Sequence, residues 1–136
     1  MAYEFSRRIK DAALTVTKAF PAAGANTNTG TIDLGSTSAY NQGQGFELEI
    51  YTPALSGFTN SAKVITYTVQ HSSDDSTYTD VGISFTVAGV ATTGSLENIK
   101  QFRLPSDVKR YIQVNIAETS AGADITGSSA IVSLRF

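Results

Sequence analysis

The sequence contains no cysteine, no tryptophan, one methionine and a single histidine, His71. The lack of cysteine excludes a disulfide framework, a thiol nucleophile and any zinc or iron–sulfur site built on thiolates. One histidine excludes a multi-histidine metal site and leaves a Ser-His-Asp triad a single candidate for its base. No G-x-S-x-G nucleophile elbow accompanies His71. We therefore expect a protein without enzymatic activity and without a cofactor.

Charge is also scarce. Charged residues make up 16% of the chain and the formal net charge is −2, whereas roughly 25% charged residues is usual. A chain this neutral lacks the basic footprint of nonspecific nucleic-acid binding.

Segments typical of membrane or secreted proteins are absent from the sequence as well. No run approaches the roughly 18 consecutive apolar residues of a membrane span. The stretch where a secretory signal would be apolar is interrupted by Arg7, Arg8, Lys10 and Asp11. We expect neither nucleic acid nor membrane as a partner, and folding in a reducing cytoplasm.

Hydroxyl side chains are abundant: 15 Ser and 17 Thr stand among the 136 residues, with 11 Gly and a hydrophobic content of 41%. This length suits one domain, and the apolar content is sufficient for a packed core. The few charges are unevenly distributed. Residues 33–97 hold seven acidic residues against Lys63 alone, whereas residues 1–18 and 100–110 are basic overall. Such asymmetry fits either complementarity to a protein partner or simply solvated faces.

The dominant hydrophobic period is two, which indicates strands. Alternation is clearest over 46–52, 63–70, 110–117 and 128–136, with shorter candidates at 13–20, 31–34, 77–81, 83–90 and 99–104. Clusters of Gly, Pro, Asn, Asp and Ser separate these segments and are typical of turns, as in 21–30 and 53–62. The pattern predicts an all-β fold, an antiparallel β-sandwich in the form of a jelly roll of about eight strands. We expect one domain over residues 14–136, preceded by an arm over residues 1–13 that fits an extended conformation as well as a helix.

The alternation also predicts which side chains are buried. In residues 46–52 it places Leu48 and Ile50 inside and Glu49 on a wet face. Four aromatic residues occupy strand positions where a core needs volume: Phe46, Phe85, Phe102 and Phe136. The others are freer to act as surface anchors: Tyr3, Phe5, Tyr40, Tyr51, Phe58 and Tyr67.

The segment from His71 to Asp80 concentrates hard ligands. His71, Asp74, Asp75 and Asp80 lie within ten residues and could hold Ca²⁺. The segment lacks the regular D-x-D-x-D-G order of a dedicated calcium loop, and a strand followed by an Asp-Ser turn and a returning strand fits better. The order therefore favours no metal, with a cation left as the alternative, and His71 is expected at an exposed strand end.

Four segments together resemble a known family. They are TIDLG (31–35), VQHSSDDSTYTDVG (69–82), FRLPSDVKRYIQVNI (102–116) and SAIVSLRF (129–136), and their most specific part is LP-x-x-x-x-RYI-x-V over 104–114. In this order the chain resembles the jelly-roll capsid cement, or decoration, proteins of tailed bacteriophages. The similarity in pattern covers most of the chain.

The resemblance implies a structural virion protein, made in the host bacterial cytoplasm and carried on the outer surface of the capsid. Its implied partners are the major capsid protein and two further copies of itself in a homotrimer. The implied arm would reach neighbouring subunits through Tyr3, Phe5, Arg7, Arg8, Ile9 and Lys10. Contacts between copies would use apolar loops such as 53–58, which exposes Leu55 and Phe58 if the core does not bury them. The alternative is a tail-associated module that binds a receptor or a carbohydrate, although the absence of tryptophan weakens the carbohydrate interpretation.

Overall fold

The computed structural model describes residues 10–35, 47–119 and 125–135. The described part contains no helix, and so none that could cross a membrane. It contains nine strands: β1 (Lys10–Ala19), β2 (Asn26–Asn28), β3 (Ile32–Asp33), β4 (Glu47–Thr52), β5 (Val64–Ser72), β6 (Thr79–Ala88), β7 (Asn98–Arg103), β8 (Tyr111–Glu118) and β9 (Ser129–Arg135). The predicted all-β fold is confirmed.

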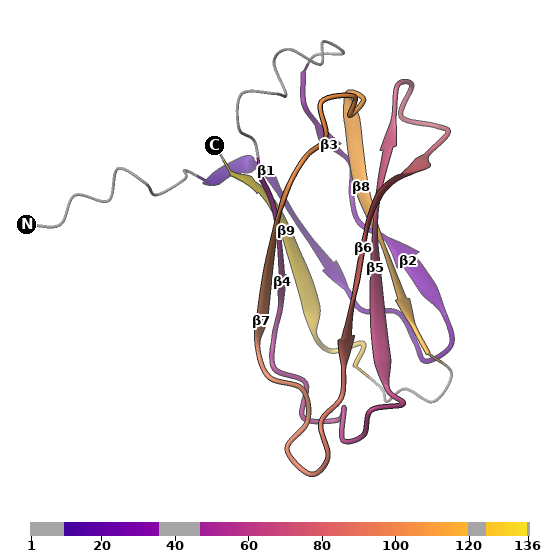
Figure 1. Cartoon of the computed structure of the whole chain (residues 1–136), viewed down its shortest axis with the longest axis vertical. Coiled ribbons are helices and arrows are strands. Elements are labelled where there is room, and N and C mark those ends of the chain that lie inside the picture. Colours follow the sequence, from indigo (N-terminus) through magenta and orange to yellow (C-terminus); the bar gives the residue numbers. More distant parts are fainter. Residues whose placement is uncertain (1–9, 36–46, 120–124, 136) are drawn as a thin grey trace, which may run out of the picture.

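The strands form two antiparallel sheets that pack face to face (Figure 1). Sheet A has the order β1-β9-β4-β7, and sheet B has the order β2-β8-β5-β6, with β3 also pairing with β8. Apart from the two-residue β3, this is the strand order of a jelly roll, in which successive strands cross from one sheet to the other except for β5 and β6, which pair within sheet B.

The core lies between the sheets and is supplied by alternate residues of the strands. On β5, Ile65, Tyr67 and Val69 are fully buried, while the residues between them are half-buried on the outer face. On β8, Ile112, Val114 and Ile116 are fully buried. The faces predicted from the period of two are confirmed for both strands.

Tyr67 belongs to this core, so its predicted role as a surface anchor is wrong. Its ring stacks on Phe85 with 4.8 Å between ring centroids. Its hydroxyl lies 2.6 Å from Oγ1 of Thr52, which is also fully buried on β4. A hydrogen bond between the sheets thus satisfies both polar groups in the core, and burial raises the pKa of Tyr67 to about 12.

The predicted wet face of β4 is wrong at Glu49, which is only 4% exposed. Its register partners are Gln101 on β7 and Ser133 on β9. Nη1 of Arg135 lies 2.8 Å from its carboxylate, and Nε2 of Gln101 donates to the same oxygen at 2.9 Å. The carboxylate can be buried because charged and amide donors from neighbouring strands surround it.

Three segment boundaries differ from the prediction. Asn26–Asn28 pairs with β8 as β2, although the Gly- and Asn-rich composition of 21–30 indicated a turn. The expected strands 77–81 and 83–90 are one strand, β6, interrupted by a bulge between the pairs Thr68↔Ser84 and Gln70↔Asp80. β1 begins at Lys10, inside the segment expected to be an arm, because Lys10 pairs with Arg135 on β9; after a register shift, regular pairing resumes at Thr15.

Candidate functional site: an apolar patch on sheet A and the loops beside it

Most of the predicted capsid-binding residues lie outside the described part of the chain. These are Tyr3, Phe5, Arg7, Arg8 and Ile9. The sixth, Lys10, opens β1 with its Cα in register with Arg135 on β9. Their role in binding therefore stays a prediction.

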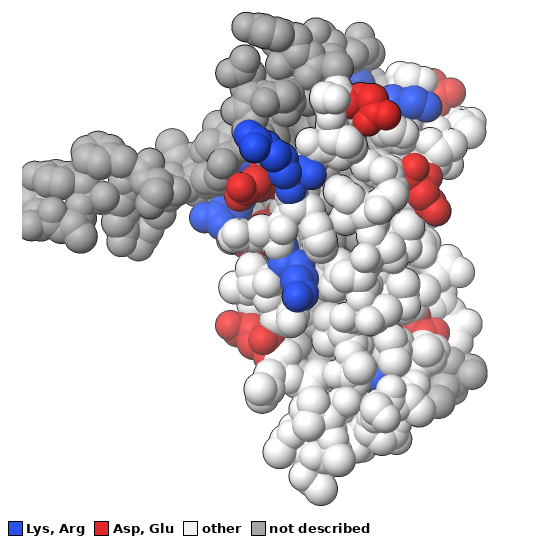
Figure 2. Space-filling view, viewed as in Figure 1, with Lys and Arg blue, Asp and Glu red and all other residues white. Residues whose placement is uncertain are grey.

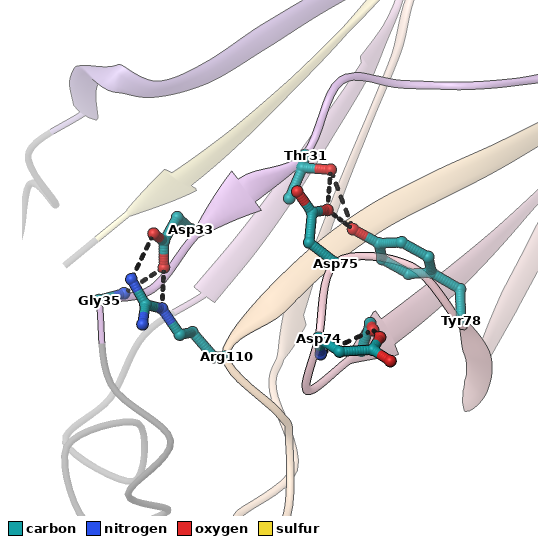
Figure 3. Close-up of polar contacts among 8 residues, drawn as sticks. Thr31, Asp33, Gly35, Asp74, Asp75, Tyr78 and Arg110 are labelled. Carbon is teal, nitrogen blue, oxygen red and sulfur yellow. Dashed lines mark hydrogen bonds and ion pairs between the residues drawn. The ribbon is translucent and has the colours of Figure 1, made fainter.

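The acidic segment after β5 forms the turn that the sequence favoured (Figure 3). The carboxylate of Asp74 accepts hydrogen bonds from the backbone N–H groups of Thr77 and Ser76, each at 3.0 Å, and from the hydroxyl of Ser72 at 2.7 Å. These bonds, led by that from Thr77, lower the pKa of Asp74 to about 2. The carboxylate satisfies the backbone of its own turn.

The neighbouring acids are likewise engaged within the chain (Figure 3). Asp75 accepts hydrogen bonds from Thr31 Oγ1, at 2.8 Å, and from the Tyr78 hydroxyl. The contact ties the β5–β6 turn to the residues that precede β3. Asp80 accepts from Gln70 Nε2 at 3.0 Å. Among the residues that the structure describes, no group of three or more histidine or acidic side chains is arranged to hold a metal ion.

His71 lies near the end of β5, as predicted, but the prediction that it is exposed is wrong. The side chain lies on the inner-facing row of β5, and the residue is 9% exposed. Its Nδ1 accepts a hydrogen bond from the backbone N–H of Lys109 at 3.2 Å. Burial, reinforced by the charge of Lys109, lowers the pKa of His71, so the ring is held as a neutral acceptor.

Leu55 and Phe58 are 2% and 0% exposed, respectively. The prediction that they contact another copy is corrected, since their side chains form part of the core at one end of the sandwich. Their loop, residues 53–63, packs against the loop 89–97 that joins β6 to β7. Leu55 and Ser95 exchange two backbone hydrogen bonds at 2.9 and 3.1 Å, and the N–H of Val90 donates to the carbonyl of Phe58 at 2.9 Å.

Two glycines allow the loops to approach this closely. A Cβ on Gly94 would lie 2.3 Å from the carbonyl oxygen of Leu55, and the residue has a φ of +79°. A Cβ on Gly89 would lie 2.3 Å from the carbonyl oxygen of Asn60. Real side chains do not approach backbone atoms at such distances, so the loops require glycine at both positions. The two loops are thus held together by backbone hydrogen bonds and by close backbone packing.

This pair of loops leads directly into an apolar patch on the outer face of sheet A. Ile131, Tyr51 and Ile99 are register neighbours across β9, β4 and β7, and Leu96 precedes β7. We call Tyr51, Ile99 and Ile131, together with the exposed residue Leu96 on the loop that leads into β7, the sheet A patch. Leu96 is 73% exposed and Ile99 52%. The hydroxyl of Tyr51 donates to Glu97 at 2.9 Å, which holds the ring beside the loop.

The outer face of sheet B is different in chemistry. Gln113 Nε2 donates to Gln70 at 2.9 Å, and Gln70 donates in turn to Asp80, so that amides link β8, β5 and β6. Asn115 Nδ2 donates to the Asn28 side chain at 2.7 Å. We call this row of amides and the carboxylate the amide ladder. It offers hydrogen-bonding groups and no large apolar side chain.

Sequence reasoning did not single out Leu96 and Ile99, although part of the signal was present. Phe102 and Leu104 lie on the core side of the β7 segment, so a period of two places Ile99 on the outer face. Leu96 lies before β7 and follows no such alternation. The residue before it, Ser95, is paired with Leu55, a contact between residues 40 positions apart that no local pattern encodes.

Comparisons with known proteins find similarity of fold alone. No family model matches the chain, and no curated protein matches it. The exported protein XepA of PBSX shares the fold with a TM-score of 0.52 and 12% identity over 88% of this chain, which spans only 34% of the XepA chain. CBM27-1 of Caldicellulosiruptor saccharolyticus, solved in complex with mannohexaose, matches with a TM-score of 0.52 and 13% identity, covering 89% of this chain and 71% of that one. At these identities the comparisons establish that the chain has this β-sandwich fold.

Proposed function

We propose that the chain is a non-enzymatic structural protein of a tailed-phage virion, a capsid cement or decoration protein. It binds the outside of the head as a homotrimer and stabilises contacts between subunits of the major capsid protein. Its partners are the capsid protein and its own copies, and it needs no cofactor. It is made in the bacterial cytoplasm and ends on the virion surface.

The sheet A patch carries this proposal. Fully burying a leucine or isoleucine side chain contributes roughly 1.5–3 kcal/mol, so Leu96 and Ile99 offer a modest gain per copy, before the costs of association. Modest contacts become strong when symmetry repeats them over a shell. The clamped loops favour binding because a rigid surface loses little conformational entropy on docking.

Two further observations support a virion role. The sandwich is shared with XepA, a protein of PBSX. The segment LP-x-x-x-x-RYI-x-V, which carries the family resemblance, contributes Leu104, Ile112 and Val114 to the core. Those residues are buried and cannot contact a partner, whereas the patch is exposed and can.

The test is a cryo-EM map of the particle, joined to a binding assay with heads that lack the protein. We expect density on the outside of the head and cosedimentation of the added chain. Leu96→Asp should reduce occupancy about tenfold or more, because it places a charge in an apolar contact. The control is Asn26→Asp, which adds the same charge at an exposed position of sheet B. Density confined to the tail would contradict the cement role. Full binding by Leu96→Asp would show that the sheet A patch does not contact the head.

The second candidate is a tail-associated module that binds a receptor or a carbohydrate. The amide ladder favours it, since planar amides pair with sugar hydroxyls and the fold is shared with CBM27-1, a structure that holds mannohexaose. Calorimetry with mannohexaose and a glycan array separates the candidates. Specific glycan binding together with tail density would support this function in place of the first.

A further inference from the structure

Sheet edges invite pairing with other chains unless something blocks them. β2 and β3 are only three and two residues long. β1 carries a register shift between Lys10 and Thr15. On β7, Lys100 is the register partner of the core residue Ile50 and so occupies an inward-facing position at the edge. Short strands, bulges and inward charges are the usual protections of an edge.

β6, at the edge of sheet B, is the exception. Its bulge ends at Ser84, and from there to Ala88 it pairs regularly with β5. Residues 81–90 contain no charged residue and no proline. In Figure 2 the surface over the middle and lower part of β6 carries little charge, whereas charged side chains gather at the upper end and on the β7 side.

The hydrogen bonds to β5 show which backbone groups face outward. The N–H of Gly89 donates to the carbonyl of Lys63 at 2.8 Å, so these two residues stand at the position of a hydrogen-bonded pair in the ladder, although the N–H of Lys63 donates to Asn60. Such pairs recur at every second residue of an antiparallel ladder, so Phe85 and Val87 bond to β5. The N–H and C=O groups of Ser84, Thr86 and Ala88 therefore point toward the free edge, where all three residues are exposed.

We propose that this edge pairs with the same edge of a second copy, antiparallel and with the two-fold axis at Thr86. In this register Thr86 lies opposite its own equivalent and Ser84 lies opposite Ala88. Each outward N–H group then donates to a carbonyl of the other copy. Phe85, only partly buried in the monomer, comes to lie beside Val87 of the second copy.

The charged residues of the two long edge strands favour a second copy of β6 as the partner strand. Asp80, the one charged residue of β6, would lie beyond Ala88 of the other chain and opposite no acid of that strand. The corresponding pairing of β7 centred at Lys100 would place two lysines directly opposite each other, which is unfavourable. A two-fold contact cannot close a ring of three, so in a trimeric protein it joins one trimer to another. This inference does not depend on the proposed capsid role.

Single cysteines in the full chain test the register, because the natural sequence has none. The Cα atoms of paired Thr86 residues would be about 5.5 Å apart, within the range that a disulfide spans. Thr86→Cys should therefore form covalent dimers under mild oxidation, seen on non-reducing gels, at least tenfold faster than two controls. Ser84→Cys lies on the same edge, but its equivalents would be about 13 Å apart along the strands. Thr66→Cys lies beside Thr86 on β5, and its equivalents would be about 14 Å apart across the sheet.

The double variant Ser84→Cys with Ala88→Cys should again cross-link, since this register brings those residues together. Equal rates for Thr86→Cys and Thr66→Cys would overturn the proposal, as would faster linkage of Ser84→Cys alone. Sedimentation velocity gives a second readout. Thr86→Pro removes an N–H that faces away from β5, a change that an edge strand tolerates. The variant should fold but lose the contact between the two edges, which halves the mass of the assembly. If the natural chain sediments as six copies and Thr86→Pro as three, both the edge contact and the trimer are supported. If the natural chain sediments as two copies and Thr86→Pro as one, the edge contact is supported and the trimer is refuted.

Discussion

Replacing glycines by alanine offers a graded test of the clamped loops that support the sheet A patch. Four glycines separate two costs, a close approach to backbone and a left-handed conformation. Gly94 has both, Gly89 has only the close approach, Gly82 has only a positive φ of +93°, and Gly127 has neither.

The expected magnitudes follow from these contacts. Forcing a methyl group into a filled space costs about 1–3 kcal/mol, and a left-handed conformation costs a non-glycine residue roughly 1–2 kcal/mol. Alanine also leaves the unfolded chain fewer conformations than glycine does, which stabilises the folded state by about 0.4–1 kcal/mol. Gly94→Ala should therefore lower the free energy of unfolding by about 2–4 kcal/mol, and Gly89→Ala by about 1–2 kcal/mol. Gly82→Ala should lower it by about 1 kcal/mol or less, and Gly127→Ala should leave it unchanged or slightly raised.

Urea unfolding followed by circular dichroism measures these differences, and unchanged m-values would show that the unfolded states are comparable. In thermal melts 1 kcal/mol corresponds to roughly 3–5 °C for a domain of this size, so Gly94→Ala should melt about 10 °C below the natural protein. If Gly94→Ala were no less stable than Gly82→Ala, the close approach of Gly94 to Leu55 would not exist as described. The loops would then not hold Leu96 in place.

Two further predictions concern polar contacts. Tyr67→Phe should lower the free energy of unfolding by about 1–3 kcal/mol, because it leaves the buried hydroxyl of Thr52 without its partner. Adding Thr52→Val should recover part of that loss. If the destabilising effects of the two changes were simply additive, the hydrogen bond between the two residues would be contradicted. Asp33 accepts hydrogen bonds from Arg110 at 2.7 and 2.9 Å, which, with the bond from the Gly35 N–H, lower the pKa of Asp33 from 3.8 to about 2. The ionised carboxylate therefore stabilises the fold above about pH 4, and this contribution fades as the pH falls toward 2. An NMR titration should place the Asp33 midpoint near 2 and show it moving upward in Arg110→Gln, and an unmoved midpoint would exclude Arg110 as the main cause.

The two outer faces suggest a division of roles. Sheet A presents Leu96 and Ile99 beside a closely packed loop pair, a surface suited to a protein partner. The amide ladder of sheet B is hydrogen-bonded within itself, and its edge strand β6 offers backbone groups to another copy. The proposed capsid role would use the first surface, and the proposed edge contact would use the second.

The all-β class and the buried faces of the main strands could be predicted from the amino-acid sequence without any knowledge of long-range contacts. A strand places successive side chains on opposite faces, so the apolar residues of β5 and β8 identified the core locally. The missing cysteines and the lone histidine excluded whole classes of site through composition alone.

Which loop residues are covered, by contrast, depends on contacts between segments far apart in the sequence. Phe58 is buried where two loops distant in sequence meet through Leu55 and Ser95. Glu49 is buried because Arg135 and Gln101 reach it from neighbouring strands, and β6 is an open edge only because of the order in which the strands assemble. Burial of such residues depends on partners distant along the chain, and a local pattern carries no information about them.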